Sequence, residues 1–287
     1  MDFILDAINE WIQNLLIDGI MGNVEGMFDS INTEVSNVAT QVGMTPSQWN
    51  GGVFSLIENL SNTVIMPIAG LILTFVMCYE LIQMIIDRNN LHDFPPSDIF
   101  KWIMKTFMAV MIVTNTFPIL MGIFDVAQNV VASSAGVIIG DTSVGLETLA
   151  EFEAALKDMD IGTLLGLYLQ SFLIGFCMWI MSICIFVIVY GRMLEIYLMT
   201  SLGAIPLATM TSKEWNMGQN YIKSMLALAF QAFLILVCVG IYAVLVQGIV
   251  TGDDPIAAIW TCVGYTVLLC FSLFKTGTLS KQIFSAH

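Results

Sequence analysis

The chain has 287 residues, of which 57% are hydrophobic and 11% are charged, with a net charge of -14. Soluble domains carry about 25% charged residues, so this composition excludes an ordinary soluble protein, and the negative charge argues against a surface that binds nucleic acid by neutralising phosphates. We predict an all-α integral membrane protein, a polytopic helical bundle.

The N-terminal region, 1–62, is predicted to form amphipathic helices outside the membrane. Apolar residues recur at helical spacing from Phe3 to Leu16 and from Met27 to Val42, and the segment GMTPSQWNGG ends the second helix. No basic segment precedes the first apolar run, so we expect no signal peptide and a retained first span. Because the polar faces are acidic, these helices either lie on the outer membrane surface or pack against a partner or a sister subunit.

Five apolar runs approach or exceed the roughly 20 residues that a membrane-spanning helix needs. The predicted spans are 63–86, 103–124, 161–190, 224–250 and 255–274. The first two form a hairpin, 63–124, with a cytoplasmic loop at 88–98. An acidic extracytoplasmic segment, 125–160, leads to a C-terminal membrane region, 161–287, which holds the other three spans.

The basic residues set the predicted orientation, because Lys and Arg concentrate in short cytoplasmic loops. The first 87 residues contain none, whereas Arg88, Lys101 and Lys105 surround the loop at 88–98. The N-terminus is therefore predicted outside the cell and this loop inside.

The run at 193–212 is too short to cross a bilayer, and Gly203 and Pro206 interrupt it. If it crossed, every later loop would violate the positive-inside rule. If it is re-entrant or interfacial, all nine basic residues except Lys157 lie in the cytoplasm. We therefore predict five spans, a non-crossing cytoplasmic-side element at 193–212 and a cytoplasmic C-terminus.

Polar residues inside the apolar runs are the candidate sites, because a charge at the membrane centre costs about 2.5 to 3.5 kcal/mol on insertion scales. Glu80 and Lys105 have matching depths in adjacent spans, which fits an ion pair, the lining of an aqueous cavity, or side chains that reach the headgroups separately. Arg192 and Glu195 share a helix face, so Glu195 is expected to neutralise Arg192. The candidate intramembrane or assembly residues are Glu80, Lys105, Arg192, Glu195, Pro206 and Gln231.

Catalytic and metal-binding patterns are missing from the sequence. The six cysteines all lie in apolar runs without a CxxC arrangement, and there are only two histidines. No phosphate-binding loop, nucleophile elbow or zinc-protease motif occurs. We expect neither enzymatic activity nor a cofactor or metal ion.

Three stretches together resemble a known family. They are WNGGVFSLIENLSNTVIMPIAGLIL, DIFKWIMKTFMAVMIVTNTFPILMGIFDVAQNVV and GRMLEIYLMTSLGAIPLATMTSKEWNMGQNYIKSMLALAFQAFLI. In order and spacing they resemble the TrbL-like polytopic conjugal-transfer proteins of type IV secretion systems, in the branch carried by Gram-positive integrative conjugative elements. The resemblance covers nearly the whole chain.

The resemblance implies a non-enzymatic membrane subunit, either a channel component or a scaffold, that works with cytoplasmic ATPases and extracytoplasmic subunits to pass single-stranded DNA with its relaxase. It also implies a homo-oligomer in the cell membrane, with Arg192, Glu195 and Pro206 in the membrane core. A small-solute transporter is the alternative from another class, although no internal repeat between the two halves supports it.

Overall fold

The computed structural model describes residues 2–86, 96–138, 146–212, 215, 217–249 and 255–286, and all regular structure in these ranges is helical. The helices are α1 (Asp2–Val42), α2 (Pro46–Trp49), α3 (Gly51–Leu60), the π-helix η1 (Ser61–Ile65), α4 (Met66–Ile86), α5 (Pro96–Thr114), α6 (Thr116–Ile138), α7 (Leu146–Lys157), α8 (Ile161–Ser201), α9 (Ala204–Ala208), α10 (Met217–Ile249) and α11 (Pro255–Ile283).

Among these described residues, five helical stretches are long and apolar enough to cross a membrane. They are Gly51–Ile86, Thr116–Ser134, Ile161–Ser201, Met217–Val246 and Trp260–Ile283. The prediction of an all-α polytopic membrane protein is confirmed. The predicted loop at 88–98 and the polar break between the last two spans lie largely outside the described residues.

The chain divides into two compact units, and α6, α8, α10 and α11 contribute to both. The first unit comprises Met1–Val42, Ser133–Val189 and Leu234–Lys275. The second unit comprises Gly43–Ala132, Tyr190–Phe233 and Thr276–His287.

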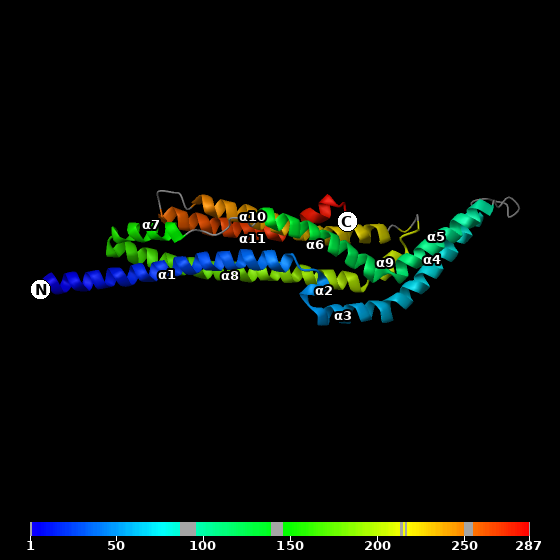
Figure 1. Ribbon diagram of the computed structural model, residues 1–287, viewed down its shortest axis with the longest axis horizontal. Coiled ribbons are helices and arrows are strands. Elements are labelled where there is room, and N and C mark those ends of the chain that lie inside the picture. The colour runs from blue at the N-terminus through cyan, green and yellow to red at the C-terminus, as the bar shows by residue number, and fades with distance from the viewer. Residues whose placement is uncertain are drawn as a thin grey trace. The chain divides into compact units, whose positions relative to one another are not determined.

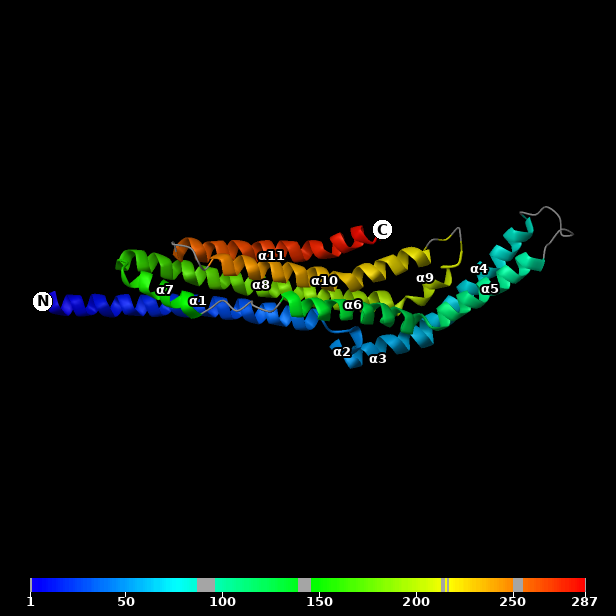
Figure 2. The ribbon, with the colours of Figure 1, turned by 45° about the horizontal axis from the view of Figure 1, so that its top comes forward.

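In the first unit, α1 lies beside the N-terminal part of α8 (Figures 1 and 2). The two predicted N-terminal helices are in fact one continuous helix of 41 residues. A Cβ atom on Gly19 would lie 2.5 Å from the ring of Tyr168 in α8. Packing of the helix backbone against this ring therefore compensates for the poor helix propensity of glycine at a point where the sequence suggested a break.

The start of α8 is capped by Asp160, which precedes it. Thr163 donates to the Asp160 carboxylate twice, from Oγ1 to Oδ1 at 2.5 Å and from its backbone N–H to Oδ2 at 3.2 Å. These hydrogen bonds hold the pKa of Asp160 below its ordinary value. The cap explains why α8 begins at Ile161, the residue at which the third span was predicted to begin.

In the second unit, α4 and α5 form an antiparallel hairpin, and α9 packs against both (Figure 1). The indole Nε1 of Trp102 donates to the carbonyl of Met77 at 3.2 Å across this hairpin. The helical stretch that contains α4 begins at Gly51, twelve residues before the predicted start at Thr63. The side chain of Asn50 caps it by accepting from the backbone N–H groups of Gly52 and Val53.

The predicted span at 103–124 is wrong as a single helix, because the chain breaks between α5 and α6 at Asn115. Pro118 has no N–H to donate to the carbonyl of Thr114, and the Asn115 side chain donates to the carbonyl of Met111 at 2.9 Å. The stretch that can cross a membrane is accordingly Thr116–Ser134, the first 19 residues of α6.

The element predicted at 193–212 also differs, because α8 continues without a break to Ser201. At 1.5 Å per residue, its 41 residues measure about 60 Å, twice the hydrocarbon thickness of about 30 Å. Only residues 202–212 form a separate segment, built from turns and the short helix α9, which contains Pro206. The non-crossing character of this segment stays a prediction.

Candidate functional site

A buried polar cluster lies where α8, α10 and α11 meet in the second unit, and Arg192 is its charged member. The Arg192 side chain comes from α8 and is only 6% exposed. Its Nε donates to the carbonyl of Leu228 in α10 at 3.2 Å. Its Nη1 is buried and has no hydrogen-bond partner among the described residues. A buried donor without a partner costs roughly 1–3 kcal/mol, and more when the group is charged.

Gln231 is the second member of the cluster and lies one helical turn beyond Leu228 in α10. Its Nε2 donates to Oγ1 of Thr276 in α11 at 3.3 Å. Its Oε1 is buried, with no hydrogen-bond partner in the part of the chain that the structure describes. One helix turn along, Ser280 of α11 donates to the carbonyl of Ala227 at 2.5 Å. Gln231 and Ser280 therefore join α10 to α11, as expected of polar residues that bridge membrane helices.

Glu195 does not hold Arg192, contrary to the sequence-based expectation. Glu195 Oε1 instead lies 3.1 Å from Nζ of Lys281 in α11, and both side chains are about half exposed, at 45% and 46%. An exposed pair of this kind contributes only about 0–1 kcal/mol. The sequence placed Glu195 three residues after Arg192, but it could not reveal that a lysine 86 residues further along the chain is closer.

The cluster has a chemical consequence, because it combines an unused donor with an unused acceptor. Arg192 Nη1 requires an acceptor and Gln231 Oε1 requires a donor. A water molecule or a hydroxyl is able to satisfy either group. The arrangement suits a joint between three helices.

Glu80 and Lys105 form a second polar contact, in the hairpin of α4 and α5. Lys105 Nζ lies 2.6 Å from both carboxylate oxygens of Glu80. The Lys105 side chain is 32% exposed and the Glu80 side chain is 16% exposed. Of the three interpretations that the sequence left open, the ion pair is the one that the structure supports.

Breaking this pair on one side is expected to destabilise the hairpin more than removing both charges. Glu80→Gln or Lys105→Met leaves an unpaired ionisable group in an apolar hairpin, whereas the double variant leaves none. The cost of each single change should fall below the roughly 3–5 kcal/mol of a fully buried pair, because Lys105 is partly exposed. Thermal unfolding of the parent, the two single variants and the double variant in detergent gives a double-mutant cycle. If the destabilisation of the double variant equals the sum of the two single effects, the pair does not exist.

The candidates thus fall into three places within the second unit. Arg192, Glu195 and Gln231 lie on α8 and α10, next to α11; Glu80 and Lys105 lie in the hairpin; and Pro206 lies in α9. Sequence reasoning missed Thr276 and Ser280 as members of the cluster. Their four-residue spacing in an apolar helix places them on one face and was a usable signal.

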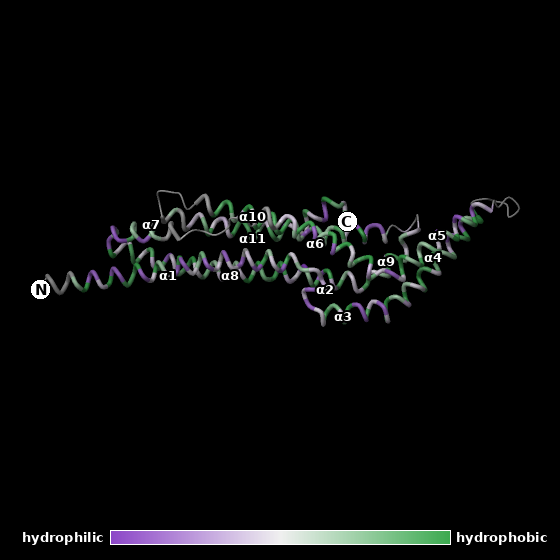
Figure 3. The backbone as a smooth tube through the Cα atoms, in the orientation of Figure 1, coloured by the Kyte–Doolittle hydropathy of each residue, from purple (hydrophilic) through white to green (hydrophobic). Residues whose placement is uncertain are grey.

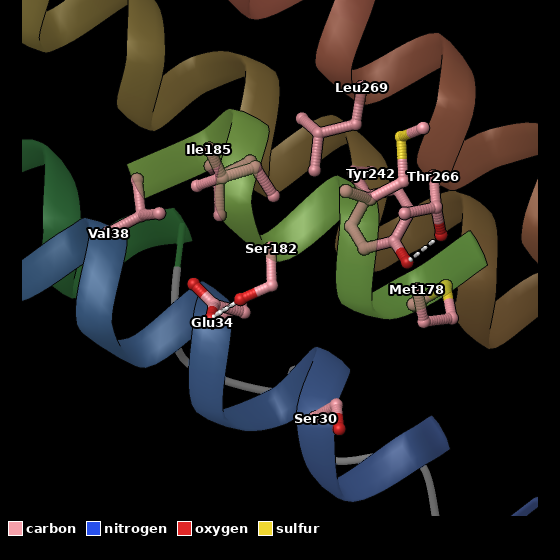
Figure 4. A pocket seen from close by; sticks show the side chains of 11 residues that line it. Ser30, Glu34, Val38, Met178, Ser182, Ile185, Tyr242, Thr266 and Leu269 are labelled. Carbon is pink, nitrogen blue, oxygen red and sulfur yellow. Dashed lines mark hydrogen bonds between the residues drawn. The ribbon is translucent and has the colours of Figure 1, made fainter. Parts of the chain in front are cut away.

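The first unit contains a small cavity that the sequence did not predict (Figure 4). Its volume is about 30 Å³, enough for one or two water molecules. Side chains from α1, α8, α10 and α11 surround it. On one side Ser182 donates to the carboxylate of Glu34, and on the other Tyr242 and Thr266 share a hydrogen bond of 2.7 Å. The cavity is too small for a nucleic-acid strand or a typical metabolite.

The chain matches a known family over much of its length. A family described as "TrbL/VirB6 plasmid conjugal transfer like protein" matches residues 31–204, more than half of the chain. The matched range includes Glu80, Lys105, Arg192 and Glu195 and ends before Gln231. No curated protein and no solved structure matches the chain.

Proposed function

Since the chain belongs to the TrbL/VirB6 plasmid conjugal transfer-like family, we propose that it is the membrane core subunit of a conjugative type IV secretion machine, on which other parts assemble. Family membership makes the protein a multi-pass membrane component of the conjugal transfer machinery, with other secretion subunits as its partners.

The observation that carries this role is that polar candidates on different helices join those helices to one another. Lys105 joins α5 to α4. Arg192 joins α8 to α10, and Gln231 joins α10 to α11. Polar side chains used in this way stabilise the packing of membrane helices, whereas a carrier for a small solute would direct them into a binding cavity.

The exposed apolar surface of α8 supports the proposal that the chain is embedded in the membrane and assembles with other subunits. Within its most apolar segment, α10 has 56% of its residues buried inside the chain, whereas α8 has only 22%. The remaining apolar surface of α8 must meet lipid, sister subunits or other machine parts. We propose that copies of the chain associate, with the N-terminus outside and the C-terminus in the cytoplasm, so that Glu195 and Lys281 lie on the side where cytoplasmic ATPases act.

The machine so built would pass single-stranded DNA with its relaxase. The chain itself would supply the membrane frame and no catalytic step. The cavity in the first unit is far smaller than a DNA strand, so we place any DNA path between subunits.

Deletion of the gene in a donor strain tests the proposed function. We expect conjugative transfer to fall to the background of a donor that lacks the machine, and expression of the intact chain from a plasmid to restore it. The remaining subunits should also fail to co-purify as a membrane complex, because their assembly platform is missing. Transfer at the parental frequency would contradict the conjugation role, and loss of transfer with an intact complex would replace the core-subunit role with that of a channel part.

A further inference from the structure

In the first unit, α1 and α8 are parallel and aligned residue by residue. Asn23 of α1 donates to Ser171 of α8 at 2.9 Å, and Ser182 of α8 donates to Glu34 of α1, with the same separation of 148 residues along the chain. Near the start of the pair, Gln13 donates to the carbonyls of Lys157 and Met159. A residue of α1 therefore lies at nearly the same height as the residue about 148 positions later (Figures 1 and 2).

Over this aligned length, the outward face of α8 is apolar. Apart from glycines and Gln170, which accepts a hydrogen bond from Nε1 of Trp260, its exposed side chains between 165 and 187 are all hydrophobic: Leu165, Tyr168, Leu169, Phe172, Leu173, Phe176, Trp179, Ile180, Ile183, Phe186 and Val187. Such a surface on a helix of this length is stable in lipid and unfavourable in water. This part of α8 therefore has the length and the surface of a helix that lies in the bilayer.

Over the same length, the outward face of α1 is polar. Among the described side chains between 18 and 40, every exposed one is glycine, hydroxylic, amide or acidic: Asp18, Gly22, Glu25, Gly26, Asp29, Ser30, Thr33, Ser36, Asn37 and Thr40. A Cβ atom added at Gly22 or Gly26 would meet nothing within 4 Å, so open space adjoins this face. Figure 3 shows hydrophilic residues recurring along α1.

These two faces cannot share one environment, because carboxylates are expensive in lipid and a continuous apolar face is expensive in water. We propose that water reaches bilayer depth along α1, so that the face formed by Asp18, Glu25, Asp29 and their polar neighbours lines an aqueous passage while the outer face of α8 meets lipid. The inference goes beyond the proposed function and replaces, for residues 18–40, the prediction that 1–62 lies wholly outside the membrane.

The lining has a chemical consequence for what the passage admits. Three carboxylates lie on the polar face, so the passage favours water and cations and disfavours a bare phosphate backbone. A transferred DNA strand would consequently not run along α1 unless its charge were covered.

Spin labels on single cysteines test the proposal in the full chain reconstituted into liposomes, with the six native cysteines replaced. Glu25→Cys and Thr33→Cys report on α1. Leu173→Cys and Ile180→Cys are the matched controls at nearly the same heights on α8. We expect the α1 labels to collide several-fold more often with a water-soluble nickel complex than the α8 labels do, and the α8 labels to collide mainly with oxygen dissolved in the lipid.

A disulfide between Asn23→Cys and Ser171→Cys should form in the same liposomes, showing that α1 stays docked while its face is wet. Nickel collisions at Leu173→Cys would overturn the proposal by removing α8 from the lipid. Protection of both α1 labels from nickel would overturn it by showing a face covered by protein. Wet α1 labels without the disulfide would overturn it as well, because α1 would then lie away from α8.

Discussion

Replacing Arg192 with Met is expected to lower conjugative transfer by about tenfold or more while leaving the unfolding temperature of the protein unchanged or higher. Methionine fills much of the same space and needs no hydrogen bonds, and replacement of buried charged groups by apolar ones is often neutral or stabilising. The decrease in transfer follows if the unused Nη1 of Arg192 donates a hydrogen bond to an acceptor in the assembled machine. One hydrogen bond to a charged group contributes roughly 1.5–3 kcal/mol, and a loss of about 1.4 kcal/mol corresponds to a factor of ten.

Conjugative transfer and unfolding temperature are measured on the same set of variants. Transfer is counted in a deletion donor that expresses each variant, and thermal unfolding is followed on the purified protein. Leu194→Met, two residues away on the exposed side of α8, is the control and should change neither. Arg192→Lys keeps the charge but loses the planar guanidinium, so we expect partial transfer.

Two outcomes would refute this role for Arg192. Parental transfer with Arg192→Met would reduce the residue to a packing group between α8 and α10. A large fall in unfolding temperature with Arg192→Met would show that the contact with Leu228 is needed for folding, and the loss of transfer would then follow from loss of protein.

Replacing Gly218 with Ala is expected to remove most of the folded protein, although alanine is the better helix former. A Cβ atom at this position of α10 would lie 2.6 Å from Cα of Met210 and 2.8 Å from the carbonyl oxygen of Pro206. Both are backbone atoms, so no side-chain rotation can relieve the clash. The segment that contains α9 would have to move away from α10, and overpacking of this kind costs typically 1–3 kcal/mol or more.

Gly264→Ala in α11 is the matched control, because a Cβ atom there meets nothing within 4 Å. Replacing a helical glycine by alanine without a clash should stabilise the protein by up to about 1 kcal/mol. Both the amount of monodisperse protein after detergent extraction and its unfolding temperature should therefore fall in Gly218→Ala. In Gly264→Ala both should stay the same or rise. Equal stability of Gly218→Ala and the parent would mean that α9 is not packed against α10.

The class of the protein follows from the sequence by itself, because hydropathy is a local and additive property and the bilayer fixes the length of a span. The apolar runs therefore identified helices that can cross a membrane, including α8 from its first residue at Ile161. The pairing of Glu80 with Lys105 could also be predicted, since a short loop makes their helices neighbours and their distances from that loop are similar. The spans depend on contact with lipid, and the ion pair depends on two helices joined by a short loop. Neither requires knowledge of contacts between distant segments.

Only the tertiary structure decided which distant groups meet. Glu195 lies one turn from Arg192, but Lys281 is its partner, because α11 packs beside α8 at that height. Packing of α11 against α10 brings Thr276 to Gln231, and packing of α8 against α1 brings Tyr168 to Gly19, where α1 remains continuous. Two apolar helices can pack against each other through many similar faces. Small differences in how their side chains fit together select one pair of faces. The sequence pattern therefore determined the helices, whereas the partners of their polar side chains depended on packing between segments far apart in the chain.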